Sequence, residues 1–156
     1  MIRSSGKIGV FGGSFDPPHS GHLEISKIAI KKLSLAKLYW CVTKKNPFKN
    51  KTLFSLSERI KQSKNITKKI KKIKIKYFDK KIKSTNTIDL IKYLNKINKK
   101  SSFFLIIGSD NLINFHKWKK WKLLTELTEI VVFSRKDYDI KAKKSVIVKK
   151  VKKIIF

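Results

Sequence analysis

Short apolar segments alternate with segments of helical periodicity along the 156-residue chain, and this alternation limits the fold more than any other feature. Runs rich in β-branched and aromatic residues predict strands at residues 7–11, 37–43, 73–77, 103–108 and 129–134, with a last strand within 145–156. Apolar residues at helical spacing predict helices at residues 21–33, 55–65, 88–97, 112–115 and 121–127. Strands that alternate with helices form parallel sheets joined by right-handed crossovers. We therefore expect an α/β fold with one doubly wound parallel sheet.

The same pattern predicts where a ligand would bind. In doubly wound sheets, ligands lie beyond the carboxyl ends of the strands, where the strand order reverses. The loops that follow "KIGVF", "YWCVT", "FFLIIG" and "IVVFS" should therefore open onto one active edge. No repeat and no Gly/Ser-rich linker divides the sequence, so residues 1–156 are expected to form a single domain.

The formal charge of +29 is the most extreme property of the composition. Only Arg3, Arg59 and Arg135 are arginines among 39 basic residues, so the excess is almost entirely lysine, spread over every segment and mixed with isoleucine and asparagine. All three of those residue types have codons rich in A and T, and we favour compositional drift over a polyanionic partner. The densest run, residues 68–83, has neither arginine nor a nucleic-acid-binding motif, so specific nucleic-acid binding is not expected. The positive field would still attract small anions such as nucleotides.

The sequence predicts a cytoplasmic protein with no membrane association. No apolar run reaches the roughly 18 residues that a membrane-spanning helix needs, and the N-terminus lacks the apolar stretch of a signal peptide. Cys41 is the single cysteine, and we expect it to be a small core residue.

The loop after the first predicted strand concentrates residues that bind anions. Gly12 and Gly13 have no side chains to keep a phosphate away, and backbone N–H groups there and near Gly21 are expected to point outward unpaired. His19 and His22 stand three residues apart, which places both rings on the same side of a first helical turn. Two imidazoles at a helix N-terminus can donate to phosphate oxygens. No cysteine or acidic cluster completes a zinc site around them, so no direct metal ligation is expected there.

The stretch "GVFGGSFDPPHSGHLEIS" as a whole resembles the signature of the HxGH nucleotidyltransferase superfamily, in which Gly-x-Phe-Asp-Pro precedes His-x-Gly-His. Residues 40–49, 86–94, 106–121 and 131–138 follow in the order seen in bacterial nicotinate mononucleotide adenylyltransferases. The segment Gly-Ser-Asp-Asn-Leu followed by Phe-His-x-Trp is the most specific of these. The resemblance covers roughly residues 7–138.

This resemblance implies a Rossmann-like fold and an enzyme of NAD biosynthesis. The activity it implies is transfer of the adenylyl group of ATP to nicotinate mononucleotide, which gives deamido-NAD and pyrophosphate. ATP and nicotinate mononucleotide would be its partners, and Mg²⁺ would enter with ATP. The 5′-phosphate of the acceptor would attack the α-phosphorus of ATP in line, which requires positioning and charge neutralisation more than an acid or a base.

The resemblance also implies roles on the phosphate side of the site. His19 and His22 would hold the ATP phosphates, with His22 stabilising the transition state. Lys49, in "NPFK", would reach the same phosphates from the second loop, and Arg135 would meet a phosphate after the fifth strand. The glycine-rich loop would contribute phosphate-binding backbone at Gly12, Gly13, Ser14 and Phe15.

On the acceptor side, the resemblance implies that Thr87 and Trp118 frame the nicotinate ring, Trp118 by stacking. Asp110 would bind a ribose or help to place the metal ion. The competing interpretations are structural: Asp110 as a helix cap, and Trp118 or Trp121 as core residues. His116 is expected to be structural.

Three features depart from the family pattern. Residues 135–138 read Arg-Lys-Asp-Tyr where the family has Arg-Pro-Gly-Tyr, and Asn86 stands where tyrosine is common. The late Ile-Ser-x-Thr-x-Arg segment that binds ATP in the family does not occur before residue 156, so we expect the C-terminal part of the family domain to be missing. Two alternatives stay open: an adenylyltransferase with another acceptor, such as nicotinamide mononucleotide or phosphopantetheine, and a non-catalytic basic nucleic-acid-binding protein on a decayed enzyme scaffold. A homo-oligomer is compatible with the sequence.

Overall fold

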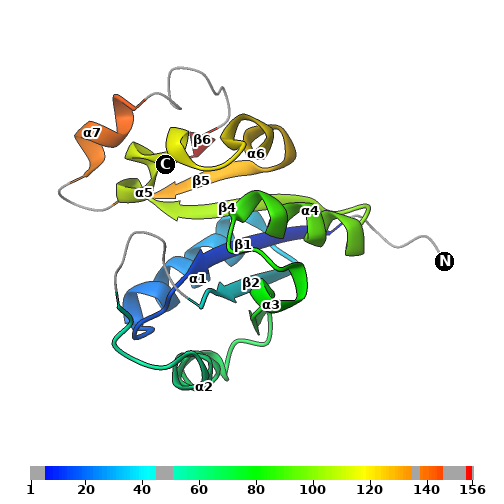
Figure 1. Ribbon diagram of the computed structural model, residues 1–156, viewed down its shortest axis with the longest axis vertical. Coiled ribbons are helices and arrows are strands. Elements are labelled where there is room, and N and C mark those ends of the chain that lie inside the picture. The colour runs from blue at the N-terminus through cyan, green and yellow to red at the C-terminus, as the bar shows by residue number, and fades with distance from the viewer. Residues whose placement is uncertain (1–5, 45–50, 135–137, 146–153, 156) are drawn as a thin grey trace.

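The computed structural model describes residues 6–44, 51–134, 138–145 and 154–155. Within these ranges, one parallel sheet forms the centre of the molecule, with the strand order β3-β2-β1-β4-β5-β6 (Figure 1). Its strands are β1 (Lys7–Gly13), β2 (Lys37–Val42), β3 (Ile73–Lys76), β4 (Ser102–Gly108), β5 (Glu129–Phe133) and β6 (Ile154–Ile155). The order reverses between β1 and β4, which is the position where doubly wound sheets bind ligands.

Helices cover both faces of this sheet (Figure 1). They are α1 (Ser20–Leu33), α2 (Leu56–Thr67), α3 (Asp79–Ile82), α4 (Thr87–Ile97), α5 (Ser109–Ile113), the 3₁₀ helix η1 (Phe115–Lys117), α6 (Trp121–Leu127) and α7 (Asp139–Lys143). None of the helices in the described ranges is long and apolar enough to cross a membrane.

Two apolar clusters, one on each face, hold the layers together. Alternate residues of β1 face opposite sides: Val10 belongs to the cluster beneath α4 and α6, and Phe11 to the cluster beneath α1 and α2. Ile91 and Leu94 of α4 are fully buried in the first cluster, which accounts for the apolar stripe of that helix. Because both faces are covered, β4 is buried and apolar from Phe103 to Ile107.

The structure confirms the α/β class and the doubly wound parallel sheet, and it corrects several element boundaries. The first strand does not stop at residue 11, because Gly12 and Gly13 still pair with Cys41 and Val42 of β2. The second and third strands end one residue earlier than predicted, at Val42 and Lys76. The short helices α3 and α7 were not predicted.

Candidate active site

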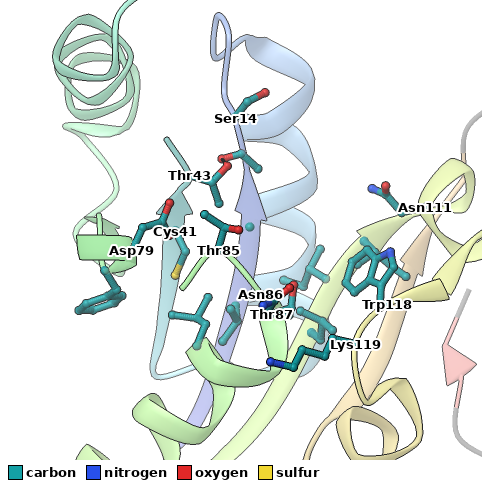
Figure 2. A pocket seen from close by; sticks show the side chains of 18 of the residues that line it. Ser14, Cys41, Thr43, Asp79, Thr85, Asn86, Thr87, Asn111, Trp118 and Lys119 are labelled. Carbon is teal, nitrogen blue, oxygen red and sulfur yellow. Dashed lines mark hydrogen bonds between the residues drawn. The ribbon is translucent and has the colours of Figure 1, made fainter. Parts of the chain in front are cut away.

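The active edge is the set of loops at the carboxyl ends of β1, β2 and β4. A cavity of about 320 Å³ opens there. Figure 2 shows how its walls are built: Ser14 and Thr43 follow β1 and β2, Thr87 begins α4, and Trp118 follows η1. Segments that are far apart in the sequence therefore meet at the predicted edge of the sheet.

The two histidines of the predicted phosphate site lie together at the start of α1. His19 is the N-cap residue, and its ring stacks on that of His22 with centroids 3.8 Å apart. The backbone N–H of His19 donates to Nδ1 of His22 at 3.1 Å, and the N–H of Gly21 donates to Nδ1 of His19 at 3.0 Å. Each Nδ1 therefore acts as an acceptor, and each neutral ring carries its proton on Nε2. The N–H donor of each ring is therefore at Nε2.

These bonds correct one expectation from the sequence. The N–H groups at the helix start were predicted to point outward unpaired, whereas those of His19 and Gly21 are capped by the histidine rings themselves. An N-cap side chain normally satisfies such groups because they have no partner within the helix. An anion at the start of the helix can therefore bind to imidazole N–H groups in place of these two backbone N–H groups.

Gly21 is needed for this cap. A Cβ atom at position 21 would lie 2.8 Å from both Cε1 and Nδ1 of the His19 ring. The ring occupies the space of the missing side chain, and this close approach explains why a glycine separates the two histidines.

Arg59 is a buried residue of the site that sequence reasoning missed. It is 1% exposed and donates to four backbone carbonyls: Ser14 O at 2.7 Å, Thr43 O at 2.7 Å, Lys44 O at 2.8 Å and Phe54 O at 3.1 Å. The guanidinium group thus connects the loop after β1, the loop after β2 and the residue just before the N-cap of α2. One signal could have found it: Arg59 is an arginine in a chain that otherwise uses lysine for almost every basic position.

Two carboxylates complete these connections. Asp16 accepts hydrogen bonds from the N–H groups of Leu53 and Phe54, the second at 2.7 Å, and so joins the β1–α1 loop to the approach to α2. Asp79, at the start of α3, accepts from the N–H of Lys44 at 2.9 Å. The two carboxylates therefore hold both described ends of the β2–α2 connection.

Burial dominates the electrostatics beside the cavity. It raises the pKa of the Asp79 carboxyl group above its usual value, and the Lys44 hydrogen bond and the Arg59 charge oppose that rise only partly. Burial also raises the pKa of the Cys41 thiol, and the nearby Asp79 charge adds to this effect. Cys41 is 3% exposed and belongs to the core, as predicted.

The predicted site residues fall into three groups. Gly12, Gly13, Ser14, Thr87 and Trp118 line the cavity together. His19, His22 and Phe15 do not line the cavity, and Phe15 is buried in the core. Asp110 does not line the cavity either, whereas its neighbour Asn111 does. Lys49 and Arg135 lie outside the described residues. No group of three or more metal-ligating side chains occurs within the described segments.

The chain thus combines a parallel sheet of this strand order with a glycine-rich turn and paired imidazoles at the switch point, the arrangement expected of a nucleotidyltransferase. In agreement with that class, the family described as cytidylyltransferase-like matches residues 10–154. A protein of Pelagibacter ubique named "Probable nicotinate-nucleotide adenylyltransferase" is 52% identical over 140 residues, which cover 90% of this chain and 77% of the relative. A protein of the same name from Ruegeria sp. is 35% identical, over 88% of this chain and 72% of the relative. The chain belongs to the cytidylyltransferase-like family and, within it, to the nicotinate-nucleotide adenylyltransferases.

Solved structures share the fold. The nicotinic acid mononucleotide adenylyltransferase of Plasmodium falciparum complexed with APC superimposes with a TM-score of 0.77 at 21% identity, over 96% of this chain and 72% of that one. The same enzyme complexed with NaAD gives a TM-score of 0.76 at 22% identity, over 96% and 73% of the two chains. At these identities the likeness supports the architecture of the chain.

Proposed function

We propose that this chain transfers the adenylyl group of ATP to nicotinate mononucleotide, releasing pyrophosphate and forming deamido-NAD. One observation carries the proposal: the stacked pair of His19 and His22 lies at the switch point of the sheet, on the same edge as a cavity framed by Thr87 and Trp118. Family membership supports the same activity, since the relatives are named for it.

The histidine pair would supply charge stabilisation. An oxygen of the acceptor's 5′-phosphate forms a bond to the α-phosphorus of ATP, the bond from that phosphorus to the bridging oxygen breaks, and pyrophosphate leaves with the electron pair. The Nε2–H groups of His19 and His22 would donate to the phosphate oxygens on which charge develops, and their orientation is set before the substrate arrives. Lys49 and Arg135 are proposed to add positive charge to the same phosphates.

The cavity would hold the acceptor. Trp118 is half-buried and would stack on the pyridine ring, while Thr87, at the first turn of α4, would contact the ring from the other wall. The ring of Phe115 packs against that of Trp118, with centroids 4.7 Å apart, so the tryptophan has a fixed support. We propose nicotinate as the preferred ring because Lys117 and Lys119 line the cavity and favour a carboxylate over a neutral amide.

The donor set fits Mg²⁺ delivered with ATP. Asp110 lies in the first turn of α5, directly after β4, and offers the hard oxygen ligand that Mg²⁺ prefers. Because Mg²⁺ usually retains water and binds phosphates in such sites, one carboxylate is sufficient protein ligation. When bound, the ion would neutralise charge on the phosphates. We propose that Asp110 holds it or the neighbouring ribose.

The test is a transfer assay that offers ATP with nicotinate mononucleotide, nicotinamide mononucleotide or phosphopantetheine. We expect turnover with the first acceptor and a decrease in kcat of about 10²–10³-fold in His22→Ala, the usual cost of losing one donor to a developing charge. Glu24→Ala is the matched control, because Glu24 is an exposed residue on the same helix. Preference for another acceptor, or full activity in His22→Ala, would overturn the proposal.

A further inference from the structure

Trp40 is fully buried in the middle of β2 and does not line the cavity, yet hydrogen bonds and ring contacts connect it to His22. Its indole Nε1–H donates to Oγ of Ser26 at 2.8 Å, and Oγ–H of Ser26 donates to the backbone carbonyl of His22 at 2.8 Å. Trp40 and Ser26 are both 0% exposed, so water has no access to either group. The second bond fixes the backbone of the residue that bears the imidazole.

A second connection runs through Phe15. The indole ring of Trp40 stacks on the Phe15 ring, with centroids 4.7 Å apart and planes 8° apart. Phe15 contacts the His22 ring in turn at 4.9 Å, and Phe11 lies 5.8 Å from that ring. Phe15 adopts a φ of 46°, a left-handed conformation that is costly for a bulky residue and that the stacked indole helps to hold.

We propose that Trp40 is a positioning residue for His22, acting on its backbone through Ser26 and on its imidazole through Phe15. The proposal rests on the proposed adenylyl transfer for its kinetic consequence. Ser26 uses its O–H to donate to the carbonyl of His22, four residues earlier in the helix. Because Ser26 is buried, its Oγ atom also needs a donor, and the indole N–H of Trp40 supplies it. Trp40 thereby fixes the first two turns of α1 against β2, next to the His22 ring that is proposed to bind phosphate.

The kinetic test compares two variants that interrupt the same path. Trp40→Phe keeps an aromatic ring and removes the N–H donor, and Ser26→Ala removes the hydroxyl group. We expect each to lower kcat by about tenfold to a hundredfold, as small misplacements of catalytic groups do, with KM for nicotinate mononucleotide within twofold of wild type. The double variant should be no slower than the slower single variant, because both interrupt one interaction. In a His22→Ala background, Trp40→Phe should have no further effect on kcat.

The control is Ile130→Val, a small truncation of a fully buried residue in the cluster on the opposite face of the sheet. It should lower the thermal midpoint as the Trp40 variant does and leave kcat unchanged. If Trp40→Phe and Ser26→Ala both keep wild-type kcat, or if Trp40→Phe slows a His22→Ala enzyme as much as it slows wild type, Trp40 is only structural and the proposal fails.

A spectroscopic readout separates this proposal from the proposed function. The chain has three histidines, so imidazole NMR signals can be assigned by substituting them one at a time. Ser26→Ala should shift the ring signals of His22 and leave those of His116 in place. Ser26→Ala is the variant to use because it removes no aromatic ring, whereas Trp40→Phe would change the ring current at His22, whose ring lies 6.0 Å from the indole. Movement of the His22 signals in a protein that turns over none of the three acceptors would support the positioning role and overturn the proposed function. Unmoved His22 signals would overturn the positioning role.

Discussion

The His19 ring fills the space beside Gly21, and this contact predicts how Gly21→Ala, which adds a single methyl group, changes stability. Replacing glycine by alanine within a helix usually stabilises it by about 0.5–1 kcal/mol. In Gly21→Ala we expect the opposite, because the new Cβ atom would displace the His19 ring and remove an N-cap worth about 0.5–2 kcal/mol. Thermal unfolding measures the stability, and the transfer assay should show a lower kcat.

Ser20→Ala is the control for that variant, since Ser20 is the exposed neighbour of Gly21 on the same helical turn. A Gly21→Ala protein that is more stable than wild type and fully active would show that the cap does not depend on glycine.

The half-buried carboxyl group of Asp79 predicts an unusual pH dependence of stability. Its pKa is raised from the ordinary value of 3.8 by burial, so the native state binds this proton more tightly than the unfolded chain does. Its contribution to the free energy of unfolding must therefore fall as pH rises from about 3.8 through the raised pKa. Asp79→Asn keeps an oxygen that can accept from Lys44 and should remove this contribution, which urea unfolding over a pH series will detect.

The carboxyl group of Asp89 should contribute to stability with the opposite pH dependence. The hydrogen bond from Ser84 lowers the pKa of its carboxyl group, so its stabilising contribution is present above the unfolded value and is lost as pH falls through the lowered pKa. Asp89→Asn should therefore lose stability at neutral pH relative to acid pH, whereas Asp79→Asn should gain it. Equal pH profiles for the two variants would contradict both assignments.

Three connecting segments depend on one side chain, Arg59 of α2. Its planar group donates to the loops after β1 and β2 and to the start of its own helix, an arrangement that a lysine ammonium cannot reproduce. In Arg59→Lys we expect the free energy of unfolding to fall by about 1–3 kcal/mol for each buried carbonyl that loses its donor. Urea unfolding near neutral pH is the measurement.

Lys61→Ala is the matched variant for Arg59→Lys, because Lys61 is an exposed cation on the same helix and should change stability by no more than about 0.5 kcal/mol. An Arg59→Lys protein as stable as wild type would mean that the four carbonyls find other donors at little cost.

The elements differ in how well their sequences predicted them. The stripe of Ile88, Ile91 and Leu94 predicted α4, because helical periodicity persists over three turns. The helices α3 and α7 span four and five residues, too short to show a period, and neither has a side-chain cap that could signal its start. The extension of β1 through Gly13 depends on pairing with β2, which is a contact between distant segments.

At the scale of the whole molecule, the charge of +29 should act on substrate capture. Exposed charges interact over a Debye length of about 8 Å at physiological ionic strength, and added salt shortens that range. We expect kcat/KM for ATP to fall steeply as NaCl increases, while kcat changes little because the bound phosphates are already in contact with the site. A kcat/KM that does not vary with salt would show that the lysines play no part in encounter.

Without the family resemblance, which pointed to Thr87 and Trp118, the site was predicted only where its chemistry is local in sequence. Gly12 to His22 form one continuous motif, so their spacing carried the information. Arg59 bonds to Ser14 across 45 residues and Asp79 to Lys44 across 35. Neither residue belongs to a sequence motif. A side chain that bonds to backbone groups far away in the sequence produces no local spacing or periodicity that could predict it. Such residues become recognisable only when folding brings the loops together.

Cys41 is the single cysteine of the chain, and its thiol lies in the wall of the cavity with almost no exposure elsewhere. An alkylating reagent must therefore enter the cavity before it can reach the sulfur, and a molecule that occupies the cavity will shield it. Because burial raises the pKa of this thiol, little of it is in the reactive thiolate form, so labelling of the folded protein should be slow and should slow further when an acceptor fills the cavity, a difference that mass spectrometry can follow.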